Sequence, residues 1–297
     1  MKSYRYGQTL ELTTANGEQI QSIRVLTNKR YLVFKTGEVK QMNTGNTKRS
    51  DNLKTVKSTM RKLRRLIAHN FTGGNNQLWI TLTYAKHVTD TKIVYQDFKT
   101  FMAKLRVLIP MVDYIAVIEP QANGRWHYHL LLRSTERLSI PNQLVAELWA
   151  KGFTKTNRLS KADKVANYVM AYLSNLEIPN SNQTTKKYVK GARLYLYPKG
   201  LRIYRRSKGI HDPIEETGSK EKILQNNGVQ PRIPDFSRYT TYETLTGEVR
   251  YTTEYYDNLQ SSQKVARLTD SGDRSSIETI SAIKKAKEIN HASSNHL

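Results

Sequence analysis

Residues 118–132 read IEPQANGRWHYHLLL, and this stretch decides how the chain around it folds. Two strand-like runs, YIAVIE (114–119) and WHYHLLL (126–132), lie on either side of the Asn-Gly pair at 123–124. Apolar runs joined by such a turn are typical of a β-hairpin. We therefore expect residues 114–132 to form two antiparallel strands.

The predicted hairpin gathers polar side chains on one face. Residues two apart on a strand share a face, so His127 and His129 point the same way and Tyr128 points the other way. If the turn places Glu119 opposite His127, then Val117 lies opposite His129. Two imidazoles and one carboxylate then converge on one side of the sheet.

Such a face predicts a divalent metal site that leaves positions open for water and substrate. A His-x-His pair on a strand is most often exposed, but WHYHLLL is apolar enough to be mostly buried, and burying three ionisable groups without a purpose is costly. Imidazole suits Zn²⁺ or Mn²⁺, and a phosphate substrate favours Mg²⁺ or Mn²⁺. We expect Mg²⁺ or Mn²⁺ held by Glu119, His127 and His129.

The charge balance points to a polyanionic partner. Among 297 residues, 48 Lys and Arg face 25 Asp and Glu, a formal net charge of +23. Nucleic acid fits this balance better than a membrane surface, because no segment pairs a long apolar face with a basic one. There is no cysteine, no apolar run long enough to span a bilayer and no signal-peptide core, so we expect a cytoplasmic protein.

Apolar periodicity predicts helices around the hairpin. Leu53, Val56, Met60, Leu63 and Ile67 recur at helical spacing, and the opposite side carries only basic charges, which indicates a phosphate-facing helix. QLWITLTY (77–84) is strand-like, and helices are expected over 98–108, 140–150 and 161–176.

The remaining segments suggest three regions. Residues 1–50 contain two hairpin signals, around Asn16-Gly17 and Thr36-Gly37, and are expected to form a β-rich N-terminal extension. Basic residues dominate up to 213, whereas residues 214–257 carry five Lys and Arg against eight Asp and Glu. We therefore expect a catalytic domain over 51–213 and a partly flexible C-terminal region over 214–297, with an α+β fold built on an antiparallel sheet with packed helices.

A pair of tyrosines lies in the helix expected over 161–176. Tyr168 and Tyr172 are four residues apart, hence on one helical face. By itself such a pair is more often core packing than chemistry. Its significance comes from the metal hairpin upstream and the basic surroundings.

In this order, the strand WITLTY, the hairpin IEPQANGRWHYHLLL and the helix YVMAYLSN resemble the three motifs of the HUH endonuclease superfamily. They are most similar to the rolling-circle replication initiators of plasmids, phages and related mobile elements of Gram-positive bacteria. The resemblance covers roughly residues 55 to 210. It implies that Glu119, His127 and His129 hold the metal and that Tyr168 and Tyr172 are the candidate nucleophiles.

The same resemblance implies a mechanism and a set of partners. One tyrosine would nick single-stranded origin DNA, at an extruded hairpin, leaving a 5′-phosphotyrosyl link and a free 3′-OH that a host polymerase extends. Two-tyrosine initiators of phages carry Lys three residues after each tyrosine, where this chain has Ala171 and Asn175; Lys164 could supply the positive charge instead. No GxxxxGK[ST] motif occurs, so unwinding is expected from a host helicase.

DNA contacts are expected from basic residues on the first helix, beside the tyrosines and in the basic segment near 202–206. They are Arg61, Lys62, Arg64, Arg65, Lys164, Arg202, Arg205 and Arg206. Three other interpretations stay open: a non-catalytic nucleic-acid-binding module, a transposase of the same superfamily, and a metallonuclease that uses water. Only the last two cut DNA, and only tyrosine chemistry leaves a covalent protein–DNA product.

Overall fold

The chain folds into two units in the computed structural model. The structure describes residues 1–16, 23–42, 53–121, 124–159, 166, 170, 176–178, 187–189, 196–198, 200–244 and 247–259. One unit comprises Met1–Asn70 with His211–Ser262, and the other is built on Phe71–Ile210. We call them the terminal unit and the central unit.

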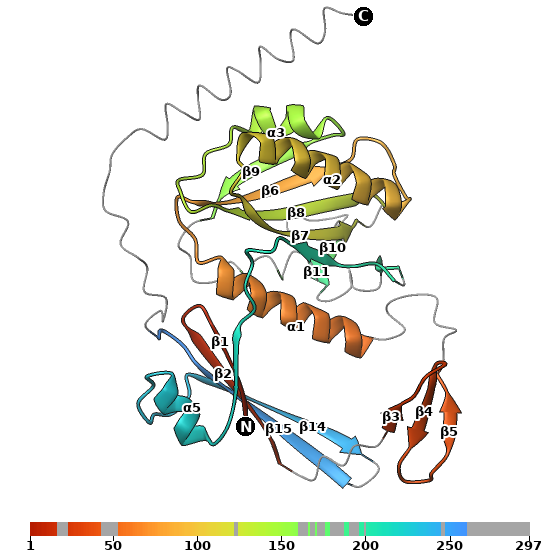
Figure 1. Ribbon diagram of the computed structural model, residues 1–297, viewed down its shortest axis with the longest axis vertical. Helices are drawn as coiled ribbons and strands as arrows, with labels where there is room; N and C mark the ends of the chain where they lie inside the picture. The colour runs from red at the N-terminus through yellow and green to blue at the C-terminus, as the bar shows by residue number, and fades with distance from the viewer. Residues whose placement is uncertain are drawn as a thin grey trace, which may run out of the picture. The chain divides into compact units, whose positions relative to one another are not determined.

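The central unit is built on a five-stranded antiparallel sheet (Figure 1). Its strand order is β12-β7-β8-β6-β9. The strands are β6 (Gln77–Thr83), β7 (Asp113–Pro120), β8 (Trp126–Arg133), β9 (Thr154–Arg158) and β12 (Tyr204–Arg206). The expected hairpin is therefore present as β7 and β8, at the middle of the sheet, where both faces can be covered.

Two helices pack on one face of this sheet, α2 (Thr91–Leu108) and α3 (Asn142–Trp149). The side chain of Asp90 caps α2 by accepting a hydrogen bond from the backbone N–H of Lys92 (2.8 Å), and Pro110 follows its end. The ring of Phe98 stacks on Tyr128 of β8 with ring centroids 4.6 Å apart. The helices therefore lie on the Tyr128 face, and the histidines of β8 point to the opposite face.

Of the helix expected over 161–176, Ala166 and Met170 are described, and both are helical. A separate two-stranded ladder pairs β10 (Leu176–Ile178) with β11 (Lys187–Val189).

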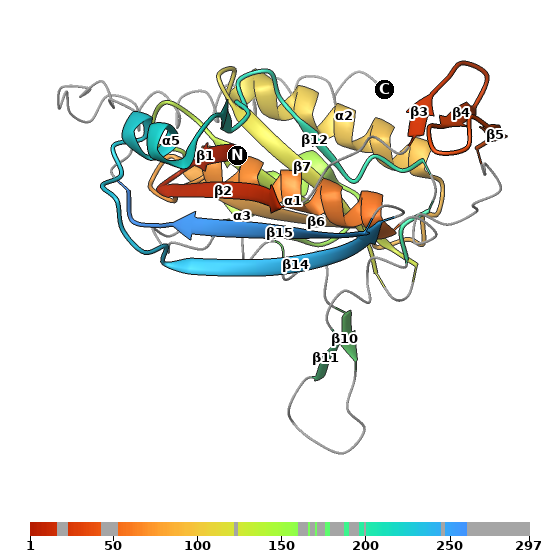
Figure 2. The same cartoon turned by 90° about the horizontal axis from the view of Figure 1, so that it is seen from below.

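The terminal unit contains a second five-stranded sheet, of order β13-β1-β2-β15-β14, whose strands are seen side by side in Figure 2. The strands are β1 (Lys2–Tyr6), β2 (Thr9–Asn16), β13 (Ile214–Thr217), β14 (Phe236–Thr244) and β15 (Gly247–Tyr256). Gly7, with φ +54°, makes the tight turn between β1 and β2. All its strand pairs are antiparallel, and together the sheets and helices of both units make the fold α+β.

Two helices contact this sheet through alternate residues of β2. Leu10 and Leu12 are fully buried and pack with residues of α5 (Lys220–Asn226). Glu11 points the other way and binds side chains of α1 (Leu53–Asn70). The period of two along the strand thus separates an apolar contact from a charged one.

A three-stranded sheet completes the described part of the terminal unit. Its strands β3 (Ile23–Val25), β4 (Arg30–Val33) and β5 (Val39–Gln41) pair in sequence order. The turn from β4 to β5 has Gly37 at φ +68°, and its N–H donates to the carbonyl of Val33 (2.8 Å). This is the hairpin expected around Thr36-Gly37.

Two expectations from the sequence differ from the structure. The Asn16-Gly17 signal does not join neighbouring strands, because β2 pairs with β1 and β15 whereas β3 pairs with β4. The division at 50 and 213 also differs, because β1 pairs with β13, β2 with β15, and α1 binds β2. Residues 1–50, the first helix and residues 214–256 thus contribute to one unit, since strand pairing joins segments more than 200 residues apart.

Candidate active site

The register of the β7–β8 hairpin is the one predicted from the sequence. Glu119 lies opposite His127, and Val117 lies opposite His129. Because opposed residues of antiparallel strands point to the same face, Glu119, His127 and His129 all lie on the face away from α2 and α3. We call it the histidine face.

Glu119 and His129 are in direct contact. Nε2 of His129 and Oε2 of Glu119 form a buried hydrogen bond, and the two residues are 4% and 1% exposed. The ring of Trp79 on β6 meets the His129 ring edge-on, with centroids 5.7 Å apart. A carboxylate and an imidazole therefore share a site enclosed by apolar and aromatic side chains.

His127 is half-buried and bonds to a residue of the turn. Its Nδ1 lies 3.3 Å from Nε2 of Gln121. The backbone of Gln121 is fixed in turn, because its N–H donates to the Arg125 carbonyl (2.8 Å) and its carbonyl accepts from the Gly124 N–H (2.9 Å). Gln121 thus orients the His127 ring, a function that the sequence pattern alone does not indicate.

Burial keeps both imidazoles neutral. Desolvation, with a smaller contribution from His129, lowers the pKa of His127 to about 4. Desolvation also lowers the pKa of His129 to about 4. At neutral pH each ring therefore has a nitrogen lone pair available, as a metal ligand requires.

The donor set suits a divalent cation, although in the described part of the chain no three His, Asp or Glu side chains are grouped closely enough to form a metal cluster. Glu119 and His129 already touch, and a cation could replace the proton that they share. His127 is the third candidate ligand, on the same face but turned toward Gln121. Two neutral imidazoles and one carboxylate are donors that Mn²⁺ accepts readily.

Strand alignment adds residues to the histidine face that the sequence analysis missed. Lys155 of β9 lies opposite Thr81, which lies opposite His129, so the three form one row across the sheet. Asn157 occupies the next row, opposite Trp79. Lys155 and Asn157 are exposed. The alternation in TKTNR (154–158) is the signal that could have identified them.

The basic segment near residue 204 divides between the two faces. Arg206 lies opposite Ile115 and shares the histidine face, where it is exposed. Arg205 points the other way, with its guanidinium 4.2 Å from the centroid of the Tyr95 ring of α2. Arg202 is exposed just before the strand. Of these three predicted DNA contacts, Arg206 is the one that the sheet places on the face of the histidines.

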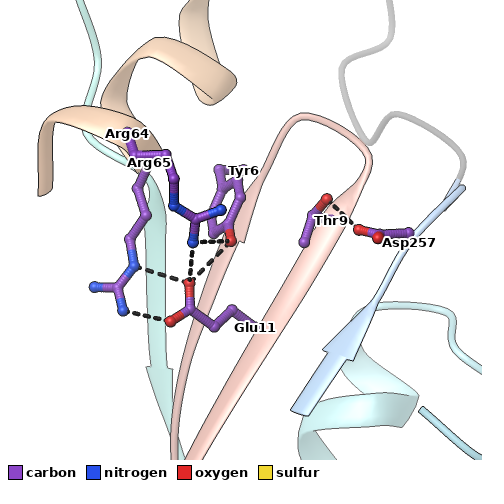
Figure 3. A network of polar contacts seen from close by, with 6 residues as sticks. All are labelled: Tyr6, Thr9, Glu11, Arg64, Arg65 and Asp257. Atoms are coloured by element: carbon purple, nitrogen blue, oxygen red, sulfur yellow. Dashed lines mark hydrogen bonds and ion pairs between the residues drawn. The ribbon is translucent and has the colours of Figure 1, made fainter. Parts of the chain in front are cut away.

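The basic residues of α1 belong to the terminal unit and divide in a similar way (Figure 3). Arg65 is 8% exposed and donates two hydrogen bonds to Glu11, from Nε (3.0 Å) and Nη2 (2.6 Å). Arg64 contacts the same carboxylate and the hydroxyl of Tyr6. Arg61 and Lys62 are exposed. The first two guanidinium groups therefore bind inside the unit, and the other two charges face water.

The candidate nucleophiles Tyr168 and Tyr172, and Lys164 beside them, lie outside the described residues. Their distance from the histidine face therefore stays a prediction. In the part of the chain that the structure describes, no helix is long and apolar enough to cross a membrane.

Comparison with known proteins agrees with this site. Residues 77–177, which include β6, β7 and β8, match the family model of the ORF2-type replication-associated protein. A curated relative, the phasyl DNA replicon protein arp of Escherichia coli, is 29% identical over 151 residues, covering 42% of this chain and 50% of that protein. The chain thus spans about half the length of the curated relative it matches. No solved structure matches the chain. These similarities support a replication initiator.

Proposed function

We propose that this protein initiates rolling-circle replication by nicking single-stranded origin DNA with a tyrosine nucleophile. One observation carries the proposal most directly. The strand register places Glu119 and His127 opposite each other and brings Glu119 into contact with His129. The match of residues 77–177 to a replication-associated family supports the same function.

Glu119, His127 and His129 would hold Mg²⁺ or Mn²⁺, which when bound would neutralise negative charge on the scissile phosphate. The protein contributes rigidity. The ligands stand on adjacent central strands, and Gln121 fixes one of the rings. Ligands held by strands and by hydrogen bonds need little rearrangement when substrate binds.

The chemistry that we assign to Tyr168 or Tyr172 is a transesterification. The phenolic oxygen attacks phosphorus and loses its proton, the bond from phosphorus to O3′ breaks, and the leaving oxygen takes up a proton. The products are a 5′-phosphotyrosyl link and a free 3′-OH. Tyrosine has an ordinary pKa near 10, so it needs a nearby positive charge, for which Lys164 is the candidate.

Exposed charges on the histidine face would hold the DNA backbone. Lys155 and Arg206 extend from the two edge strands of the sheet, one on each side of the histidines. Cations at such places neutralise phosphates and fix the register of the strand. We assign unwinding of the duplex to a host helicase and extension of the 3′-OH to a host polymerase.

The test is a denaturing-gel assay for a covalent adduct. The full chain is mixed with labelled single-stranded oligonucleotides that tile the replicon's origin region, with Mn²⁺ or with EDTA. Tyr168→Phe, Tyr172→Phe and the double variant are compared with Tyr239→Phe, a control in an exposed tyrosine of the terminal unit. We expect an adduct that needs Mn²⁺, survives in the control and disappears in the double variant.

Other outcomes identify the alternatives. Metal-dependent cleavage without an adduct means that water is the nucleophile and refutes the tyrosine mechanism. Binding without cleavage, on oligonucleotides that include the origin, leaves a non-catalytic binding module. Joining of cut ends from a mobile element, with no requirement for an origin, indicates a transposase.

A further inference from the structure

The sheet β3–β5 of the terminal unit has no interior. None of the residues described between 23 and 42 is buried, and Val25 and Val39 are 67% and 51% exposed. Three short strands need an apolar face in contact with something to be stable. The same 20 residues contain five Lys and Arg and one acid, Glu38.

The two faces of this sheet differ in chemistry. The register pairs Arg24 with Leu32, Leu32 with Val39, and Arg30 with Gln41, so these five side chains share one face. The other face carries apolar and aromatic side chains and one cation, Lys40, which is paired with Glu38 (2.9 Å). In the described structure no ion pair engages Arg24 or Arg30, and both are exposed. We call the face of Arg24, Arg30, Leu32, Val39 and Gln41 the arginine face.

We propose that the arginine face binds double-stranded DNA in the major groove. This inference deepens the proposed function, because it assigns duplex binding to residues remote in sequence from the nicking motifs. Arg pairs with the guanine edge, Gln pairs with the adenine edge, and apolar side chains contact the thymine methyl group. The arginine face carries all three types.

Size and composition favour a duplex over a single strand. Neighbouring strands lie about 4.8 Å apart, so three strands span roughly 10 Å, which fits a major groove about 12 Å wide. Single-strand binding relies on aromatic side chains that stack on bases. The arginine face has no aromatic residue, since Tyr31 points to the other face.

The turn between β3 and β4 adds a cation at the tip of the hairpin. Asn28 and Lys29 have φ +57° and +56°, the left-handed pair of a type I′ turn, whose second place usually holds glycine. A lysine there is strained, and Lys29→Gly relieves the strain while removing the charge. This variant therefore separates a loss of binding from a loss of folding.

The test measures binding to a fluorescein-labelled 24-base-pair duplex of mixed sequence by anisotropy over a range of salt. Arg24→Ala with Arg30→Ala is compared with Lys99→Ala and Lys104→Ala, two exposed positions of α2 whose loss changes the net charge equally. We expect the arginine-face variant to lower the slope of log K against log salt by about 1.8, and affinity in 0.1 M salt by roughly 60-fold. The control should change both much less.

Two further measurements complete the test. Lys29→Gly should lower the slope by about 0.9 with an unchanged or higher melting temperature. Adduct formation on single-stranded oligonucleotides should persist in every variant, so absence of an adduct in the unaltered protein would count against the proposed nicking function and leave the duplex assay valid.

Three results would overturn the inference. Equal losses in the arginine-face variant and the α2 control would show diffuse attraction by net charge. Loss of adduct formation together with binding would show general damage to the fold. Dissociation of an oligomer by the arginine-face variant in sedimentation, with duplex affinity unchanged, would show a contact between copies of this chain.

Discussion

Removing the carboxylate of Glu11 should destabilise the terminal unit by about 4 kcal/mol. Glu11 is 1% exposed, and it accepts two hydrogen bonds from Arg65 and one from Tyr6 (2.9 Å). Glu11→Ala leaves the buried Arg65 guanidinium without its counter-ion, a change that costs about 3–5 kcal/mol. Arg64 adds little, because its side chain is 28% exposed and can turn to water.

The magnitude can be separated from general damage by removing both charges. A buried ion pair replaced by apolar residues of similar size is often neutral in stability. Glu11→Leu combined with Arg65→Met should therefore stay within about 1 kcal/mol of the unaltered protein. A double-mutant cycle between these two positions should give a coupling energy of several kcal/mol.

The assay is guanidinium unfolding followed by two signals. The chain has three tryptophans, Trp79, Trp126 and Trp149, and all lie in the central unit. Circular dichroism reports both units and tryptophan fluorescence reports the central one, so a loss in the terminal unit should appear in the first signal and leave the second unchanged. A cost below about 1 kcal/mol for Glu11→Ala would refute the argument.

The pH dependence of this pair has a definite sign. Burial raises the pKa of Glu11, but the hydrogen bonds and charge of Arg65 lower it further, so the net shift is downward. A carboxyl whose pKa is lower in the folded state stabilises the protein above its unfolded pKa and loses that contribution as pH falls through the folded value. The difference between the unaltered protein and Glu11→Ala should therefore shrink in acid.

Three further predictions concern the central unit. Gly152→Ala should cost about 3 kcal/mol in tryptophan-monitored unfolding, because an added Cβ would lie 2.5 Å from the backbone of residues 83 and 85; a cost near zero would contradict this. Without metal, this unit should lose about 2 kcal/mol between pH 6.5 and 4, because the buried His127 has its pKa lowered to about 4 and resists the proton that the unfolded chain accepts; His127→Phe should remove that slope. Gln121→Ala should weaken Mn²⁺ binding roughly 10- to 100-fold, measured by quenching of tryptophan fluorescence, whereas an unchanged affinity would remove Gln121 from the site.

Local patterns predicted the hairpin well because its constraints are local. The period of two fixes which residues share a face, and the turn fixes which residues are opposite, so the pairing of Glu119 with His127 follows from a short stretch. The structure has the same register. The contact of Gln121 with His127 did not follow, because it depends on the path of the turn rather than on spacing.

The terminal unit could not be predicted in the same way. Alternation shows that residues 9–16 form a strand, but it does not name a partner, and the partner of β2 lies beyond residue 246. The Asn16-Gly17 signal was stronger than the turn at Gly7, which is the one that joins neighbouring strands. Arg65 looked like one more cation on a basic helix, because nothing near it in sequence reveals Glu11.

The surroundings of each arginine, rather than the net charge, decide what it can do for DNA. Arg65 and Arg205 are held by groups of their own unit, a carboxylate and an aromatic ring, and releasing them would cost those contacts. Arg206 and Arg24 are exposed on sheet faces that carry other polar side chains. Alanine at Arg206 or Arg24 should therefore reduce the salt dependence of DNA binding with little change in stability, whereas alanine at Arg65 should reduce stability with little change in the salt slope. The opposite pattern would mean that Glu11 releases Arg65 when DNA binds.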